Sequence, residues 1–167
     1  MIKIAITNLE MYNEGELIFE WVTLPCDDFS EVFESIGNPE EYFISDYECD
    51  DLQIEIHEYS NLDKWNEFAE KLDSLKSHEL KIIKAIAEAE SEISIEEVFE
   101  IYEKEDYVFY DEKTIEDLAY TLVEHGYLGD IPEDIVPYID YDKFARDLYH
   151  GGYVETSHGI IYFYWGR

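Results

Sequence analysis

Positive charge is scarce in this sequence of 167 residues. It holds 11 Lys and Arg against 42 Asp and Glu, which gives a formal net charge of -31. Between Lys3 and Lys64 there is no Lys or Arg at all. Proteins bind nucleic acids and anionic membranes through Lys and Arg, so this balance excludes both as direct partners. The expected partner is a basic protein surface.

Cysteine and long apolar runs are also scarce. The two cysteines, Cys26 and Cys49, lie far apart without C-x-x-C spacing, which excludes a zinc ribbon and gives no disulfide framework. No apolar run reaches the roughly 18 residues of a membrane-spanning helix, and the N-terminal run meets Glu10 too soon for a signal peptide. We therefore expect a soluble protein of the cytoplasm.

The sequence also lacks the common motifs of catalysis and metal binding. It contains no G-x-S-x-G, no P-loop and no G-x-G-x-x-G. The His-Glu pairs at 57–58 and 78–79 lack the second His of a zinc-binding H-E-x-x-H, and Asp51 stands where an EF-hand loop requires Gly. We expect a protein that is not an enzyme and has no cofactor and no metal site. Loose binding of Ca²⁺ or Mg²⁺ and a hydrolase built on paired carboxylates stay open as alternatives.

Apolar residues are plentiful enough for a folded core. Hydrophobic residues make up 46% of the chain and aromatic residues 16%, unlike chains that charge keeps disordered. Alternating apolar residues predict strands at 2–8, 17–22, 42–44 and 52–56, with a short helix around 29–36. These elements would form an N-terminal α+β domain over residues 1–60, made of an antiparallel sheet and a short helix.

The apolar period changes from two to 3.6 after residue 60, which predicts a helical middle domain over 61–104. Ser94 and Glu97 have the spacing of a capping box at the start of one of its helices. Residues 105–167 then predict a C-terminal α+β domain with a strand at 107–110, helices at 115–123 and 140–148, and a closing hairpin at 153–165. The fold class is therefore α+β, with three small modules in an elongated chain.

The acidic residues repeat in a way that folding does not require. Glu88/Glu92 and Glu96/Glu100 each place like charges four residues apart, which destabilises a helix by roughly 0.2–0.5 kcal/mol per pair. A halophilic protein would also be acidic, but this chain is rich in large Ile, Phe, Tyr and Trp residues. A DNA mimic fits better, because the net charge equals that of about 50 Å of duplex. The candidate target-binding acids are Glu40, Glu41, Asp46, Glu48, Asp50, Asp51, Glu88, Glu92, Glu96 and Glu100.

Several segments of the sequence resemble one known family. They are Ile4-Ala5-Ile6-Thr7-Asn8-Leu9, Tyr12-Asn13-Glu14-Gly15-Glu16-Leu17, a Trp21 strand ending at Pro25, Tyr138-Ile139-Asp140-Tyr141, Arg146-Asp147-Leu148 and His158-Gly159-Ile160. Together they span nearly the whole chain and resemble the ArdA antirestriction proteins. One departure is Ala145, where many members have Gly; since Ala suits a helix better, this affects local packing.

The resemblance implies an elongated three-domain homodimer, joined through its C-terminal domain, that mimics bent B-form DNA. It implies that the partner is the methyltransferase core of type I restriction-modification enzymes, whose DNA groove the protein would occupy. It also implies carriage on conjugative plasmids and transposons, where the protein would protect incoming DNA during horizontal gene transfer. The residues alone support only an acidic DNA mimic without catalytic activity.

Two further expectations concern partners. Because an aromatic-rich terminal strand would otherwise be an exposed edge, the candidate dimer contacts are Tyr153, Val154, Ile161, Phe163 and Trp165, although these residues could equally form the core of their own module. The alternative function is an acidic chaperone or sequestering partner of a basic DNA-binding protein. Such a partner would accept many basic ligands, whereas a mimic would select for shape at matched charge.

Overall fold

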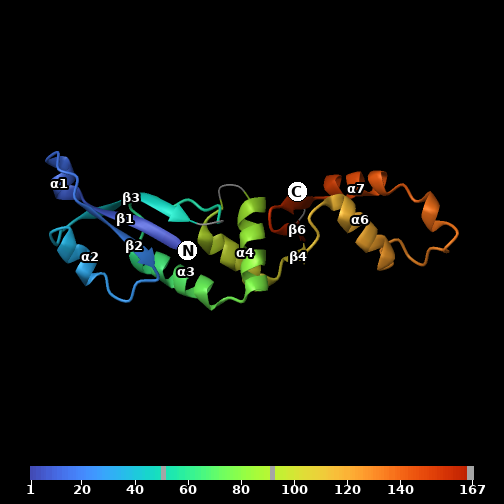
Figure 1. The fold of residues 1–167 in the computed structure, drawn as a ribbon, viewed down its shortest axis with the longest axis horizontal. Helices are drawn as coiled ribbons and strands as arrows, with labels where there is room; N and C mark the ends of the chain where they lie inside the picture. Colours follow the sequence, from blue (N-terminus) through green and yellow to red (C-terminus); the bar gives the residue numbers. More distant parts are fainter. Residues whose placement is uncertain (50–51, 91–92, 165–167) are drawn as a thin grey trace. The chain divides into compact units, whose positions relative to one another are not determined.

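The computed structural model describes residues 1–49, 52–90 and 93–164. The chain forms two compact units, Met1–Lys76 and Ser77–Arg167, here called unit 1 and unit 2 (Figure 1). Each unit holds one three-stranded antiparallel sheet with helices, so the α+β fold class is confirmed. The division into three modules stays a prediction. No helix in the described ranges is both long enough and apolar enough to cross a lipid bilayer.

The sheet of unit 1 is built around β1 (Ile2–Asn8). Its neighbours are β2 (Phe19–Leu24) and β3 (Tyr42–Cys49), in the order β2-β1-β3. As the central strand, β1 is buried along most of its length, and Ile4 and Ile6 are fully buried. The register between β1 and β3 shifts between Ala5 and Ile6, which is a bulge.

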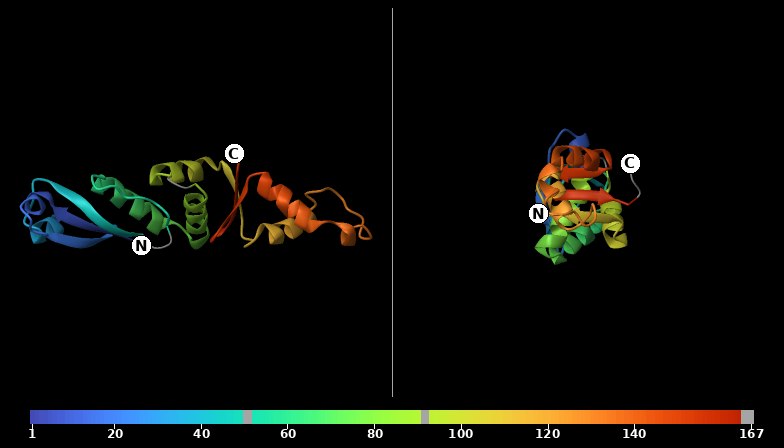
Figure 2. Two further views of the ribbon diagram at one scale, coloured as in Figure 1. Left: turned by 90° about the horizontal axis from the view of Figure 1, so that it is seen from above. Right: turned by 90° about the vertical axis from the view of Figure 1, so that its right-hand side faces the viewer.

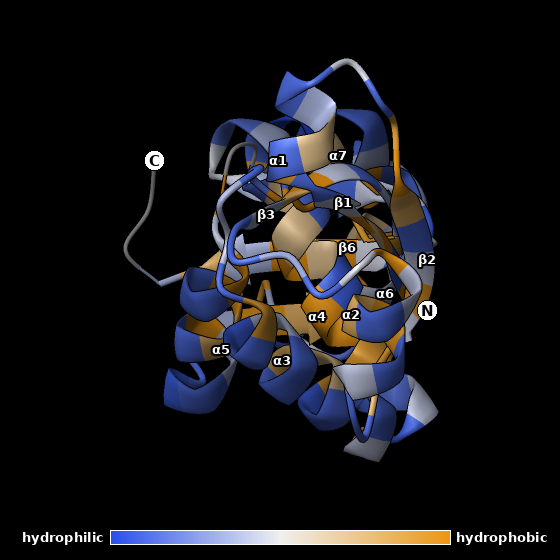
Figure 3. Ribbon diagram, turned by 90° about the vertical axis from the view of Figure 1, so that its left-hand side faces the viewer, coloured by the Kyte–Doolittle hydropathy of each residue, from blue (hydrophilic) through white to orange (hydrophobic). Residues whose placement is uncertain are grey.

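Three helices accompany this sheet: α1 (Leu9–Asn13), α2 (Ser30–Ser35) and α3 (Leu62–Ser74). The side chain of Asn61 caps α3 by accepting from the Lys64 N–H. The buried residues of α3 recur at helical spacing and are Leu62, Trp65, Phe68 and Ala69. Its other positions are mostly hydrophilic, as the blue colour of much of α3 shows in Figure 3.

Unit 2 begins with α4 (Ser77–Ala89) and α5 (Ile95–Lys104). The predicted capping box is present, because Ser94 and Glu97 each bond the other's backbone N–H. Buried residues surround α4 on several sides, including Ile82, Ile83 and Ile86. The reason is that α4 packs against α5 and also against the C-terminal hairpin.

The sheet of unit 2 has the order β4-β6-β5, formed by β4 (Tyr107–Tyr110), β5 (Tyr153–Thr156) and β6 (Gly159–Phe163). Between β4 and β5 the chain forms α6 (Ile115–Glu124), a short 3₁₀ helix η1 (Val136–Tyr138) and α7 (Tyr141–His150). α6 and α7 lie side by side (Figure 2). A core cluster joins these two helices to Ile160 of β6.

Two expectations at the level of elements were wrong. Residues 52–56 do not form a strand, although Leu52, Ile54 and Ile56 alternate in burial as a strand would. Alternation of apolar residues shows which side of the segment is buried. A strand also needs a neighbouring strand with free N–H and C=O groups. Here the Ile54 N–H instead donates locally to the Leu52 carbonyl. The sequence interpretation also missed α1, whose first turn is capped by Asn8.

Candidate functional site

Four candidate acids lie in or next to β3 of unit 1. Glu40 and Glu41 come just before the strand, Asp46 and Glu48 lie on it, and all four are exposed. Asp46 and Glu48 are two residues apart in a strand and so share one face of the sheet. The bulge between β1 and β3 comes just before Asp46, and it fixes which face the acids occupy.

Little positive charge balances these acids. The Lys3 ammonium lies 3.1 Å from the Glu48 carboxylate, its partner in the β1–β3 register. Both side chains are well exposed, so this ion pair contributes little to stability, on the order of 0–1 kcal/mol. No other Lys or Arg precedes Lys64 in the sequence. The four exposed acids Glu40, Glu41, Asp46 and Glu48 are here called the acidic face of unit 1. Within the strands of this unit, Lys3 is the one cation that balances them.

Two more candidate acids lie on α5 of unit 2. Glu96 and Glu100 are exposed and one helical turn apart, so they occupy the same side of the helix. The Lys104 ammonium donates to Glu100, and this hydrogen bond raises the pKa of Lys104. Glu97 points to the cap instead, where hydrogen bonds from Ser94 lower the pKa of its carboxyl. Of these acids, Glu100 is thus paired with Lys104 and Glu97 is committed to the helix cap.

Glu88 does not lie on a free surface. Its carboxylate accepts the Ser157 N–H at 2.9 and 3.0 Å and the Ser157 hydroxyl at 2.6 Å, and the Nε2 atom of His158 lies 3.9 Å away. Its side chain is only 23% exposed. The acid that the sequence pattern placed on an outward helix face therefore holds α4 to the turn between β5 and β6.

The remaining candidate acids, Asp50, Asp51 and Glu92, lie outside the described residues, as does the candidate dimer contact Trp165.

The other candidate dimer contacts differ in burial. Tyr153 and Val154 on β5 are half-buried, whereas Ile161 and Phe163 on β6 are buried inside unit 2, Ile161 completely. β6 is the central strand of its sheet, with β4 and β5 on either side. Ile161 and Phe163 thus belong to the core of their own unit. This was the alternative to a dimer contact that the sequence left open for these residues.

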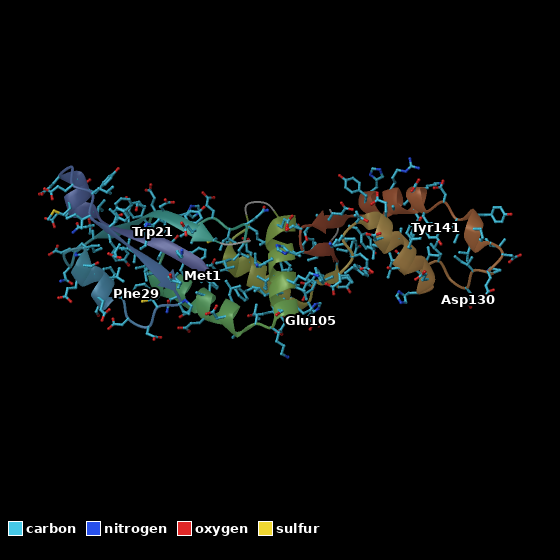
Figure 4. All side chains as sticks on the ribbon, in the orientation of Figure 1. Met1, Trp21, Phe29, Glu105, Asp130 and Tyr141 are labelled. Carbon is cyan, nitrogen blue, oxygen red and sulfur yellow. The ribbon has the colours of Figure 1, made fainter. Side chains whose placement is uncertain are left out.

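Exposed apolar side chains lie at two places that the sequence interpretation missed. On β2, Phe19 and Trp21 share an exposed face, and Figure 4 shows Trp21 there. The two residues are two positions apart on an edge strand, so their side chains lie on one face of the sheet. The second place lies between α6 and α7, and its exposed members are Tyr127, Leu128, Ile135, Val136 and Tyr138. The sequence did contain a sign of this second place, because apolar residues in a loop that also contains Gly and Pro indicate an exposed apolar surface.

Unit 2 also contains a pocket of about 290 Å³. Its lining includes Tyr127, Phe144, Asp147, Leu148, Tyr153 and Tyr162. The rings of Tyr153 and Tyr162 stack with centroids 4.8 Å apart, and those of Tyr127 and Phe144 lie 5.8 Å apart. Burial, followed by the proximity of Tyr110 and Tyr127, raises the pKa of the Tyr153 hydroxyl.

The abundant acids do not gather into a metal site in the part of the chain that the structure describes, where no group of three or more His, Cys, Asp or Glu side chains could hold an ion. The acids described above are spread over separate elements, and the interactions they can offer a partner are electrostatic and hydrogen-bonding.

Comparison with known proteins identifies the family. The family model of the antirestriction protein ArdA matches residues 4–162, which is nearly the whole chain. A comparison with curated protein sequences gives no match. The chain therefore belongs to the ArdA antirestriction family, whose members inhibit type I restriction-modification systems and are not enzymes.

Proposed function

We propose that this chain inhibits type I restriction-modification enzymes as a DNA mimic, by occupying the groove of the methyltransferase core that binds DNA. The observation that carries the proposal is the net charge of -31, with exposed acids such as Asp46 and Glu96 on surface elements. The protein would act in the cytoplasm, where the restriction enzymes meet incoming DNA.

Electrostatics explains how such a protein competes with DNA. A groove lined with Lys and Arg binds DNA by displacing the counterions of the phosphates, and the observed affinity then falls steeply as salt rises. Carboxylates placed in the same groove release the counterions of the groove in the same way. Because many acids share the interaction, no single carboxylate is expected to dominate it, and the inhibition should weaken as salt rises.

The test is a displacement titration. The protein is added to a type I methyltransferase core bound to its labelled target duplex, at several salt concentrations. We expect release of the duplex near one equivalent of binding sites, with weaker release at higher salt. Absence of release by correctly folded protein would contradict the proposal. Equal binding to unrelated basic proteins would instead favour the acidic chaperone.

A pair of variants separates charge from shape. The variant E40Q/E41Q/D46N/E48Q removes four exposed charges of unit 1, and the matched variant E40D/E41D/D46E/E48D keeps every charge. We expect the first to displace DNA more weakly than the parent protein and the second to displace it about equally well. Equal activity of both variants would show that this acidic face does not contact the target.

We further propose that two copies of the chain pair through unit 2. Support comes from exposed apolar side chains between α6 and α7 that do not line the pocket, namely Leu128, Ile135, Val136 and Tyr138, of which Tyr138 is 84% exposed. Such residues in a soluble chain mark an interaction surface. The half-buried Val154 is a secondary candidate, whereas Tyr153 lines the pocket of unit 2 and is left out of the pairing surface.

Sedimentation equilibrium tests the pairing. We expect the parent protein to sediment as a dimer, and the variant I135D/Y138D as a monomer with an unchanged circular dichroism spectrum. Y149D is the control, since Tyr149 is also exposed but lies on α7 outside this loop. Dissociation by the control alone, or a dimer that survives I135D/Y138D, would place the interface elsewhere.

A further inference from the structure

The pocket of unit 2 combines aromatic faces with one carboxylate. From α7, the residues Phe144, Asp147 and Leu148 recur at helical spacing, so one stripe of the helix forms one wall. From the sheet, Tyr153 and Tyr162 face each other in the β5–β6 register and stack. Both α7 and β6, which are labelled in Figure 1, belong to unit 2.

This lining has the chemistry of a cation site. The faces of Tyr and Phe rings carry negative potential and attract a cation within about 6 Å. Asp147 is the one carboxylate among the lining residues, it is exposed, and in the described part of the chain its side chain has no ion-pair or hydrogen-bond partner. Its neighbour Arg146 donates instead to the Asp142 carbonyl. A negative group beside several aromatic rings is thus available to an incoming cation.

The size and shape of the pocket favour one long side chain. About 290 Å³ lies just below the range for small-molecule sites, which starts near 300 Å³. Flat stacked rings suit a planar cation, and guanidinium is planar, more weakly hydrated than an ammonium group and able to bond both oxygens of a carboxylate. These properties select arginine over lysine.

We propose that this pocket binds an arginine side chain of the basic partner protein, with the guanidinium stacked on Tyr153 or Tyr162 and hydrogen-bonded to Asp147. This inference rests on the proposed function, because it takes the arginine from the DNA-binding groove of the target. It adds a specific recognition site to a surface that otherwise interacts through distributed charge.

The direct test uses methylguanidinium as the probe and N-methylurea, its neutral isostere, as the control. Amide NMR spectra of the full-length protein are recorded at constant ionic strength while either compound is added. We expect saturable shifts at Gly151, Gly152 and Tyr153 with methylguanidinium, and none with N-methylurea. Two results would overturn the proposal. One is an equal response to both compounds, and the other is the absence of a saturable response to methylguanidinium, as when a second molecule of the protein fills the pocket.

Variants locate the binding site. D147N and Y127L change exposed positions of the pocket, so both should fold, and each is expected to weaken methylguanidinium binding about threefold, as for an exposed ion pair or a cation–π contact. D142N is the matched control, since Asp142 is also exposed on α7 but does not line the pocket. A weakening by D142N as large as that by D147N would reduce the effect to overall charge and overturn the site.

The link to the partner is tested separately. D147N should also weaken displacement of DNA from the methyltransferase core, more than D142N does. If the parent protein displaces DNA and D147N is indistinguishable from D142N, the arginine is not the target's and the inference fails while the proposed function stands. If the parent protein displaces no DNA, the proposed function fails whatever the probe shows.

Discussion

Asn8 connects two helices of unit 1 through one buried side chain. Its Oδ1 accepts the Met11 N–H at 3.0 Å and so caps α1, while its Nδ2 donates to the Ile36 carbonyl at the end of α2 at 2.9 Å. The residue is only 3% exposed. Neither group can turn to water, so the side chain fixes the positions of both helix ends beside the end of the central strand β1.

Substitution of Asn8 separates these two roles. N8A is expected to lower the free energy of unfolding by about 2–3 kcal/mol, because the cap is lost and a buried carbonyl is left unpaired. N8D keeps the capping oxygen but turns a carboxylate oxygen toward the Ile36 carbonyl. We therefore expect N8D to lower the free energy of unfolding at pH 7. In acid the stability should recover partly, because a protonated carboxyl can donate to that carbonyl. Urea unfolding measures both. Parent-like stability of N8D would mean that the bond to Ile36 contributes nothing.

Tyr107 gives the protein a dependence on alkaline pH. Burial first, and then the neighbouring Tyr102 and Glu105, raise the pKa of Tyr107 to about 12 from its ordinary value of 10.0. Between these values the unfolded chain loses a phenolic proton that the folded chain keeps, so stability falls as pH rises. The contribution of Tyr107 is fully present below pH 10.

We therefore expect Y107F to lose less stability than the parent protein between about pH 10 and 12. Unfolding in urea at several pH values, with tyrosinate absorbance as a second readout, measures the difference. Y12F is the control, because Tyr12 is exposed and belongs to unit 1. Parallel pH profiles of Y107F and the parent protein would refute the assignment.

At the scale of elements, α4 is attached to the C-terminal hairpin by the bonds from Ser157 to Glu88. The two residues are 69 positions apart, so the contact closes a long stretch of chain. We expect E88Q to lower the stability of unit 2 by about 1–2 kcal/mol, since the charged acceptor is lost, and S157A by less, since its N–H still donates. Urea unfolding of both variants and of the double variant gives their coupling energy.

A control for this prediction is E133Q, which removes an exposed charge in the loop before η1. It should leave the stability within about 0.5 kcal/mol of the parent protein. If E133Q destabilises unit 2 as much as E88Q does, the loss of stability is not specific to Glu88, and the proposed role of its bonds to Ser157 is contradicted.

The elements themselves were predictable where local chemistry decides them. The capping box of α5 and the apolar periods of α3 and α6 depend on neighbours within one or two turns, and the structure confirms them. Residues 52–56 failed because strand pairing depends on a distant neighbour. Glu88 failed as a surface acid for the same reason, since Ser157 lies far from it in the sequence.

At the scale of the whole molecule, the excess of acid over base sets the response to salt. Charges of one sign repel each other in the folded state, and salt screens them: the Debye length falls from about 30 Å at 0.01 M to about 10 Å at 0.1 M. We expect the urea midpoint to rise over this range, while DNA displacement weakens. The variant E40Q/E41Q/D46N/E48Q should show a smaller rise. A midpoint that salt leaves unchanged would mean that self-repulsion is already relieved within the fold.

The sequence by itself determined the fold class, most of the helices and strands, and the family, because these depend on composition, on local periodicity and on short segments such as Tyr138-Ile139-Asp140-Tyr141. Only the tertiary structure decided which residues remain available to a partner. It placed Ile161 in the core, paired Glu88 with Ser157 and brought Asp147 beside Tyr153 and Tyr162. The physical reason is that burial and hydrogen bonding of a side chain depend on residues distant in sequence, whose positions only the folded chain fixes.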